Sequence, residues 1–405
     1  MFRKIYLLLL IFVIVFASSA CQNASSIDVK DNTSNDVNLE KDNKLDKDSS
    51  DKKNLKEVIV IEDKKTEKEE DTVQSEASKE KTSTDSEVKV STKNSVDSNT
   101  SEKEKSKLSG LLFDKSELEK RPVAVMLDNQ YYARPQSGLS EAEVVYEILA
   151  EGLITRYMAV FYGNAPKRVG PIRSARPYFI NKALEYDPLY AHVGGSPAAW
   201  ADLVNLNVAD LDGLSGNGMY RTSKTNKKPP HNTYSSISAL RKAGSNRKYR
   251  LKGNFDFFEF YSKDEKPINS EQANYLKIVY KKSSSSDKTG YYVEFKYDKD
   301  LKEYYRYVNG KHHIDEANGE NLTAKNIIVQ FAKHKVIDDK GRLKIDDLGK
   351  GDAYLLTMGV KTKLTWSKKN RESMTKFYDK DGKLIELNKG VTWFEVVPKT
   401  IKLGW

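Results

Sequence analysis

The stretch RPVAVMLDN at residues 121–129 carries the clearest fold signal in the chain. Five consecutive apolar residues, Val123 to Leu127, lie between a proline and the polar pair Asp128-Asn129. Such a short apolar run, bounded by polar and turn-forming residues, is typical of a strand buried inside a sheet. We therefore expect residues 123–127 to form a buried strand of a folded domain.

The elements predicted after this strand alternate between strand and helix. Residues 154–162 and 189–193 predict two more strands, whereas residues 144–150 fit a strand or a helix. Pro177 opens a predicted helix, and Ser196 is placed to cap a second one that ends near residue 206. This alternation predicts an α/β domain over residues 108–250.

Residues 251–405 follow a different pattern. Aromatic residues recur with period two in YYVEFKY at residues 291–297 and in YYRYV at 304–308, and Asn309-Gly310 supplies a turn. The pattern predicts antiparallel strands. The predicted fold class is therefore α+β: an N-terminal α/β domain with a sheet and flanking helices, then a β-rich antiparallel C-terminal domain.

Composition separates both domains from the segment that precedes them. Residues 22–107 contain 17 basic and 22 acidic residues but no Phe, Tyr, Trp, Gly or Pro. Too little apolar surface is present to offset chain entropy, so we predict a disordered, charged tether over residues 21–107. Residues 108–405 have 49 basic against 36 acidic residues. A cytosolic enzyme that fills the whole length is excluded.

The N-terminus has the layout of an export signal. A basic start precedes an apolar run over residues 5–17, which is short for a membrane span, and small residues precede Cys21, the only cysteine. This arrangement resembles the lipobox of bacterial lipoproteins. The resemblance implies a signal peptide over residues 1–20 and lipid modification of Cys21 by diacylglycerol and palmitate. An uncleaved anchor or a free thiol remains the alternative.

Cationic side chains are concentrated in the first folded domain. Arginine binds carboxylate or phosphate through paired hydrogen bonds, and backbone amides at a helix start favour an anion. A histidine after Pro229-Pro230 is presented to solvent and suits acid, base or donor roles. The predicted ligand-binding residues are Arg156, Arg168, Arg173, Arg176, Gly194, Gly195, Ser196, Arg221 and His231.

A structural role for the same side chains stays open. The arginines have Glu147, Glu151, Asp187 and Asp202 as available ion-pair partners, and His231 is equally compatible with a hydrogen bond to the backbone. No phosphate-loop, dinucleotide, nucleophile-elbow or zinc motif occurs, so no cofactor and no metal are predicted. The adjacent His312 and His313 would point to opposite faces of a strand and make a poor chelate.

Several long motifs occur in the order that is typical of the YerB-like lipoproteins of Gram-positive bacteria. These motifs are RPVAVMLDN, ARPQSGL at 133–139, EGLITR at 151–156, RVGPIRSAR at 168–176, HVGGSP at 192–197 and PHNTY at 230–234. The resemblance extends from residue 108 to the C-terminus. It implies a lipoprotein anchored to the extracytoplasmic face of the cell membrane, in a family without an established activity.

The predicted function is a non-enzymatic, lipid-anchored envelope protein that binds an anionic envelope polymer or a partner protein. Nucleic acid is not expected as a partner, because wall polymers and lipid head groups are the anions outside the membrane. The arrangement of Arg156, the arginine-rich strand end and the Gly-Gly turn is also similar to the LytR-CpsA-Psr wall-polymer transferases. That likeness implies an enzyme acting on lipid-linked polymer, and a pure interaction scaffold is the third alternative.

Overall fold

The computed structural model describes residues 102–253, 255–284 and 290–405. The predicted signal peptide, Cys21 and nearly all of the predicted tether lie outside these residues. The tether was expected to reach residue 107, but β1 (Lys103–Lys105) pairs with β2 (Leu112–Asp114), and Leu108 is buried. The folded part therefore includes residues that the sequence assigned to the tether.

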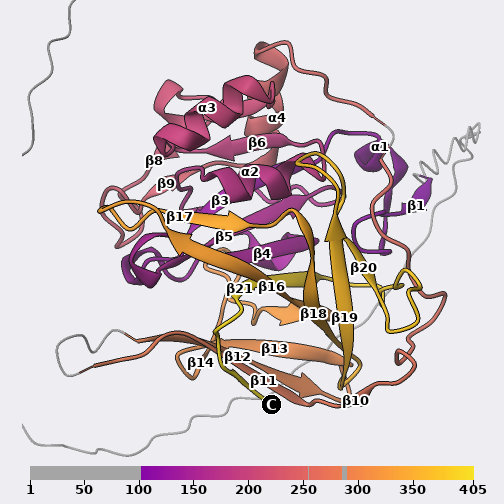
Figure 1. Ribbon diagram of the computed structural model, residues 1–405. Helices are drawn as coiled ribbons and strands as arrows, with labels where there is room; N and C mark the ends of the chain where they lie inside the picture. Colours follow the sequence, from indigo (N-terminus) through magenta and orange to yellow (C-terminus); the bar gives the residue numbers. More distant parts are fainter. Residues whose placement is uncertain (1–101, 254, 285–289) are drawn as a thin grey trace, which may run out of the picture. The chain divides into compact units, whose positions relative to one another are not determined.

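A mixed twelve-stranded sheet runs through both predicted domains (Figure 1). In spatial order its strands are β10 (Glu271–Gln272), β19 (Val360–Lys368), β18 (Gly349–Thr357), β16 (Asn326–Val336), β21 (Thr392–Pro398), β4 (Val144–Leu149), β5 (Thr155–Phe161), β3 (Val123–Asp128), β6 (Leu189–His192) and β7 (Asp210–Asp212). Strand β17 (Leu343–Asp346) pairs with β16, and β20 (Lys376–Tyr378) pairs with β19.

Strand β21 joins the two predicted domains. It lies between β16 and β4 and is parallel to both. In this register Glu395 of β21 lies opposite Glu147 of β4. The last long strand of the chain thus completes a sheet whose other half is built from residues before 213.

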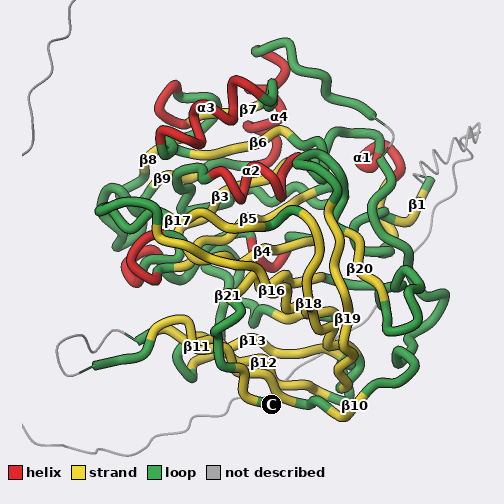
Figure 2. The backbone as a smooth tube through the Cα atoms, viewed as in Figure 1, coloured by secondary structure: helices red, strands yellow, loops and turns green. Residues whose placement is uncertain are grey.

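The period-two aromatic stretches form a second, six-stranded antiparallel sheet, which Figure 2 shows beside the large one. Its strands are β14 (Lys311–His312), β13 (Glu303–Val308), β12 (Tyr291–Asp298), β11 (Tyr275–Lys281) and β22 (Leu403–Gly404), with β15 (Thr323–Ala324) paired to β13. A short separate pair consists of β8 (Tyr220–Arg221) and β9 (Thr233–Tyr234). The predicted β-rich C-terminal region is confirmed, and its paired strands are antiparallel except for β16 and β21.

The helices are short. They are α1 (Lys115–Leu118), α2 (Pro177–Leu184), α3 (Pro197–Asn205) and α4 (Ile237–Asn246). Two of them, α2 and α3, begin at the predicted residues Pro177 and Pro197. The Ser196 hydroxyl accepts a hydrogen bond from the Ala199 amide, as its position before Pro197 predicts. The ambiguous residues 144–150 form a strand, because neighbours on both sides pair with them.

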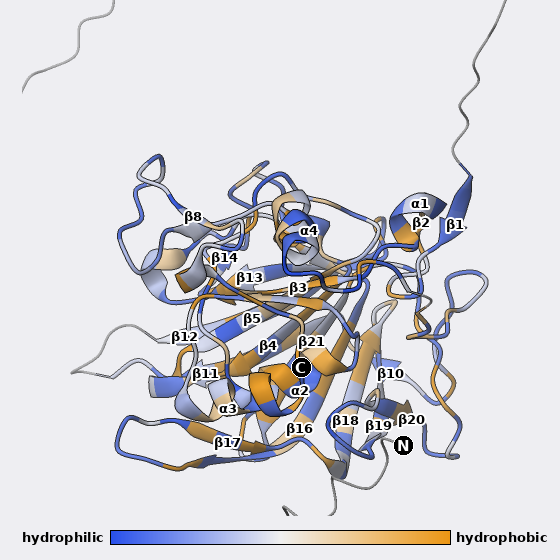
Figure 3. Ribbon diagram, turned by 90° about the horizontal axis from the view of Figure 1, so that it is seen from above, coloured by the Kyte–Doolittle hydropathy of each residue, from blue (hydrophilic) through white to orange (hydrophobic). Residues whose placement is uncertain are grey.

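Both faces of the large sheet are covered, which explains the continuous apolar run in β3. Val123, Val125 and Leu127 belong to a core cluster shared with α4 and the six-stranded sheet. Ala124 and Met126 face the opposite cluster, which contains residues of α2 and α3. The hydropathy view shows hydrophobic residues on α2 and along the strands of the large sheet (Figure 3). The predicted α+β class is confirmed.

Candidate functional site

Asp128 gathers two of the predicted ligand-binding residues at the end of β3. Its side chain is almost fully buried, and one carboxylate oxygen, Oδ2, lies 2.7 Å from Nδ1 of His231 and 3.3 Å from Nε of Arg173. The other oxygen accepts the Gln130 amide at 3.0 Å. We call Asp128, Arg173 and His231 the Asp128 cluster.

Backbone contacts place Arg173 between two parallel strands. Its amide donates to the Met126 carbonyl in β3, and its carbonyl accepts the Val193 amide just after β6. These strands are parallel, so the cluster lies where their carboxyl ends meet. Open α/β sheets commonly bind ligands outside this edge.

The Asp128 cluster keeps hydrogen-bonding capacity for a ligand. A carboxylate oxygen only accepts, so the His231 Nδ1 carries the hydrogen and Nε2 is left over. Among the described residues, neither His231 Nε2 nor the terminal Arg173 nitrogens have a hydrogen-bond partner. The two side chains are 15% and 29% exposed. Each is therefore oriented by Asp128 at one edge while its other edge remains available.

The predicted glycine turn is mostly used by the fold itself. The Gly194 amide donates to Asp212 Oδ1 at 2.8 Å, and the Ser196 amide donates to the Ala175 carbonyl at 3.4 Å. Of the three predicted donors, only the Gly195 amide has no partner among the residues that the structure describes. An anion site built on this turn would therefore compete with bonds that hold the turn.

Arg156 and Arg176 converge, but on a carboxylate rather than on an open pocket. Glu151 accepts Nη2 of Arg156 at 3.3 Å and Nε of Arg176 at 2.5 Å. Burial would raise the pKa of Glu151, but the hydrogen bond from Arg176 and the charge of Arg156 lower it below its ordinary value. Burial in turn lowers the pKa of Arg156 to about 10. Arg156 and Arg176 therefore form structural ion pairs, which was the alternative to ligand binding.

Arg168 and Arg221 contact other residues than Asp128. Arg168 donates to Ser137 Oγ at 3.1 Å and to the Glu316 carbonyl at 3.0 Å. Arg221 donates to Asn232 Oδ1 at 3.0 Å from an exposed position in β8. The predicted set is therefore divided among several local environments.

The other carboxylates that were candidate ion-pair partners of the predicted arginines bind arginines outside the predicted set. Asp187 binds Arg121 and Arg250, Asp202 binds Arg371, and Glu147 binds Arg306. All four of these arginines are distant in sequence from the carboxylates they contact. Their pairing follows from the tertiary structure and not from local spacing.

A cleft of about 680 Å³ adjoins the Asp128 cluster. Its walls come from residues 131–135 and 226–227 of the first predicted domain and residues 308–316 of the second. Tyr132 lines the cleft, and its ring centroid is 6.5 Å from that of His231. The cleft therefore lies next to the His231 side of the cluster.

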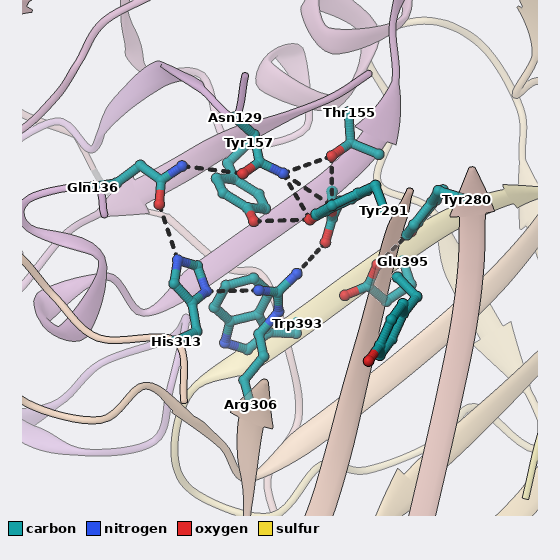
Figure 4. A network of polar contacts seen from close by, with 12 residues as sticks. Asn129, Gln136, Thr155, Tyr157, Tyr280, Tyr291, Arg306, His313, Trp393 and Glu395 are labelled. Carbon is teal, nitrogen blue, oxygen red and sulfur yellow. Dashed lines mark hydrogen bonds and ion pairs between the residues drawn. The ribbon is translucent and has the colours of Figure 1, made fainter. Parts of the chain in front are cut away.

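A buried polar network lies behind the cleft and joins the two halves of the chain (Figure 4). Arg306 of β13 and Glu147 of β4 form an ion pair with both side chains fully buried. Glu147 Oε1 also accepts hydrogen bonds from Thr155 at 2.6 Å and Tyr291 at 2.5 Å. Hydrogen-bond donors and a guanidinium therefore surround the Glu147 carboxyl group.

His313, which lines the cleft, connects to this network. Arg306 Nη1 lies 2.6 Å from its Nδ1, and since a guanidinium cannot accept, the Nδ1 must be the unprotonated nitrogen. The other nitrogen, Nε2, then donates to Gln136 Oε1 at 2.9 Å. Burial and the charge of Arg306 hold the pKa of His313 well below its ordinary value. His312, one residue earlier, is exposed, as expected for adjacent residues of a strand.

Glu395 is the second carboxyl of the network. Burial and the neighbouring charge of Glu147 raise its pKa well above the ordinary value. The Tyr280 hydroxyl donates to one of its oxygens at 2.5 Å. We therefore assign Glu395 as the protonated carboxyl group of the network.

Sequence reasoning missed several central residues of this region. Asp128 was treated as the end of a strand, and Tyr131, Tyr132 and Arg306 were not singled out. The polar residues directly after the buried strand were the available signal for Asp128. For Arg306 the chain offers none, because its partner Glu147 is 159 residues away.

Across 102–253, 255–284 and 290–405, no cluster of three His, Cys, Asp or Glu side chains is arranged to hold a metal ion. Within the same ranges, no helix has both the length and the apolar character needed to cross a bilayer.

Family models match both halves of the chain. Residues 108–250 match the N-terminal domain, and residues 282–394 the C-terminal domain, of a protein of unknown function, DUF3048. The chain belongs to the DUF3048 family. The family description assigns no activity, and both of these domains contribute strands to the large sheet and residues to the cleft.

Relatives of this DUF3048 chain include a protein from Bacillus subtilis (strain 168) named "Putative lipoprotein YerB". It is 36% identical over 299 residues, which cover 74% of this chain and 88% of the relative. The crystal structure of the Bacillus subtilis YerB protein is also similar, with a TM-score of 0.67 and 33% identity. It covers 74% of this chain and 99% of the solved one. The resemblance to YerB-like lipoproteins is confirmed.

Proposed function

We propose that this chain is a lipid-anchored protein on the extracytoplasmic face of the cell membrane, where its Asp128 cluster binds an anionic envelope ligand. The anchor is supported by Cys21 after small residues and by a relative that is named as a lipoprotein. Two acyl chains suffice for stable membrane attachment. The tether of about 80 residues would then let the folded part reach ligands away from the bilayer surface.

The observation that carries the binding proposal is the sharing of one oxygen, Asp128 Oδ2, by Arg173 and His231. This arrangement orients the Arg173 guanidinium and the His231 ring side by side while the buried carboxylate uses only one edge of each. An anion would accept from the guanidinium, and also from His231 Nε2 when the imidazole is protonated. Because the guanidinium is already oriented, less side-chain entropy of Arg173 is lost when an anion binds. Charge-assisted hydrogen bonds of this type are stronger than neutral ones.

The comparison with Arg156 and Arg176 supports assigning the site to Arg173 and His231. The first two arginines already share Glu151, and Arg156 is nearly buried. A ligand at Arg156 and Arg176 would have to replace their ion pairs with Glu151. A ligand at Arg173 and His231 can bind while their contacts with Asp128 stay in place. In this proposal Arg156 and Arg176 hold the structure, and Arg173 and His231 contact the ligand.

The test uses the double variant Arg173→Gln/His231→Gln in the full-length protein in detergent. Glutamine retains an N–H donor for Asp128, so folding is preserved while both potential cations are removed. The affinities for poly(glycerol phosphate) and for tetragalacturonate are measured by titration calorimetry. For the anion that binds the wild-type chain, we expect the double variant to have an affinity about tenfold lower or more. A decrease of this size corresponds to one charge-assisted hydrogen bond.

Arg247→Ala is the matched control, because Arg247 is an exposed arginine whose side chain contacts only Tyr249 in the described structure. It should bind like the wild-type chain. Binding that is the same in the double variant and the wild type, with both folded by thermal unfolding, would remove the Asp128 cluster as the site.

A second candidate function is favoured by the Asp128–His231 contact of 2.7 Å. An aspartate that accepts from Nδ1 leaves Nε2 able to take a proton from a substrate hydroxyl or water, as in general-base catalysis. An enzyme acting on lipid-linked wall polymer would use this nitrogen. Incubation with a lipid-linked oligosaccharide and Mg²⁺ tests it: product that falls at least a hundredfold in His231→Gln supports catalysis, and no product refutes it.

A further inference from the structure

Two tyrosines stand largely exposed at the rim of the cleft beside the Asp128 cluster. Tyr131 and Tyr132 are 66% and 67% exposed, and their rings meet edge to face at 5.3 Å. Both line the cleft. Adjacent large aromatic side chains that stay in solvent typically mark a binding surface.

The backbone under these tyrosines is fixed before any ligand arrives. They belong to the short helical turn Tyr131–Ala133, where the Gln130 side chain accepts the Tyr132 amide at 2.7 Å. Asp128 in turn accepts the Gln130 amide. Tyrosine has few rotatable bonds, so a held pair offers contact area at a small cost in entropy. The same carboxylate therefore orients the Asp128 cluster and this turn.

The cleft also carries positive charge that the fold does not neutralise. Arg134 stacks 4.4 Å above the Tyr291 ring and donates to Asn129, which is a neutral partner. Lys311 is exposed on β14. Neither cation has an ion-pair partner among the described residues. Lys227, by contrast, is paired with Glu316 at 2.5 Å.

These features together select a class of ligand. Aromatic faces pack against the C–H faces of sugar rings, and the Asn226 side chain on the cleft wall suits sugar hydroxyls. The unpaired cations require negative charge on the same molecule. A concave cleft of about 680 Å³ encloses a chain segment and does not fit a flat bilayer.

We propose that the cleft between residues 131–135 and 308–316 binds an acidic glycan, with Tyr131 and Tyr132 stacking on sugar rings and Arg134 and Lys311 binding its anionic groups. This inference rests on the proposed function, because the Tyr132 ring is 6.5 Å from that of His231. A glycan chain that occupies the cleft would reach the Asp128 cluster with a neighbouring acidic group.

The experiment compares four probes on the full-length protein in detergent. Tetragalacturonate has acidic sugar rings, poly(glycerol phosphate) has charge without rings, dextran oligomers have rings without charge, and a dT oligomer has charge with bases. We expect tetragalacturonate to bind most tightly. Tighter binding of the dT oligomer or of poly(glycerol phosphate) would overturn the assignment to an acidic glycan.

Variants locate the binding. Tyr131→Ala and Tyr132→Ala should each weaken tetragalacturonate binding by about three- to tenfold, the size expected for one aromatic contact, and leave poly(glycerol phosphate) binding unchanged. Lys311→Ala should weaken both anions, more at low salt. Trp405→Ala is the control, since Trp405 is an exposed aromatic that contacts Tyr354 and Lys361 instead of the cleft.

The outcomes separate this inference from the proposed function. Tyrosine variants without effect, together with lost binding in Arg173→Gln/His231→Gln, would refute the glycan cleft and leave the Asp128 cluster in place. The reverse pattern would refute the cluster and keep the cleft. If no acidic probe binds the wild-type chain, both proposals fail.

Discussion

Glu147 and Asp128 are both carboxylates of the large sheet that accept an arginine, yet they differ in what surrounds them. Glu147 and its partner Arg306 are fully buried, and tyrosine, threonine and asparagine donors complete the shell around the carboxylate. Asp128 is equally buried, but Arg173 and His231 reach it from the surface. The first pair joins two halves of the chain, and the second leaves donors for a ligand.

This difference shows that burial of a carboxylate alone does not mark a functional site. What matters is whether its partners have hydrogen-bonding edges that the fold has not used. Breaking a closed network should therefore cost stability, whereas breaking an open one should mainly cost binding. Three predictions test this distinction.

The largest effect is expected for Glu147→Gln. The change leaves the Arg306 charge buried without its counterion. If the glutamine oxygen keeps accepting from Tyr291 and Thr155, its amide N–H group faces the Arg306 guanidinium. Breaking a buried pair in this way costs about 3–5 kcal/mol of unfolding free energy. Urea unfolding measures it, with the exposed Glu119→Gln as control. A loss below about 1 kcal/mol would show that the network is not a closed structural unit.

The second effect is a pH dependence of the unfolding free energy that comes from Glu395. Because the folded-state pKa of Glu395 is raised, its contribution to stability is complete below the unfolded pKa and is lost as pH rises. The wild-type chain should therefore lose about 1.4 kcal/mol per pH unit from this group above about pH 4.3, until the folded form ionises. Glu395→Gln should remove that loss and be the more stable chain at pH 7.

Thermal unfolding of the wild type and Glu395→Gln between pH 4 and 8 measures this difference. The two curves should approach each other near pH 4 and separate at higher pH. Parallel curves over the whole range would contradict the assignment of a protonated Glu395.

The smallest stability effect is expected for Asp128→Asn. An asparagine oxygen can still accept one donor, and Arg173 can turn into solvent, so a loss of about 1–2 kcal/mol is expected. The free energy of tetragalacturonate binding should change by more than the free energy of unfolding, because His231 and the Gln130 turn lose their common orienting group. Urea unfolding and titration with tetragalacturonate compare the two. A larger stability loss than for Glu147→Gln would reverse the comparison between the sites.

Much of the secondary structure could be predicted because its signals are local. The apolar run in β3, the serine cap of α3 and the aromatic alternation in β12 each depend on neighbours a few residues away. The residues of the candidate site were only partly predictable. Arg173 and His231 were named, but their common partner was not, because a strand-ending aspartate is also a common turn residue.

The sequence by itself determined which segments are apolar enough to form a core and where α2 and α3 begin. The tertiary structure alone decided that β21 enters the sheet beside β4, that Glu147 meets Arg306, and that Glu151 takes two of the arginines. The physical reason is range. Propensity, capping and hydrophobic periodicity act over a few residues, whereas the pairing of charges depends on which strands become neighbours when the whole chain buries its apolar surface.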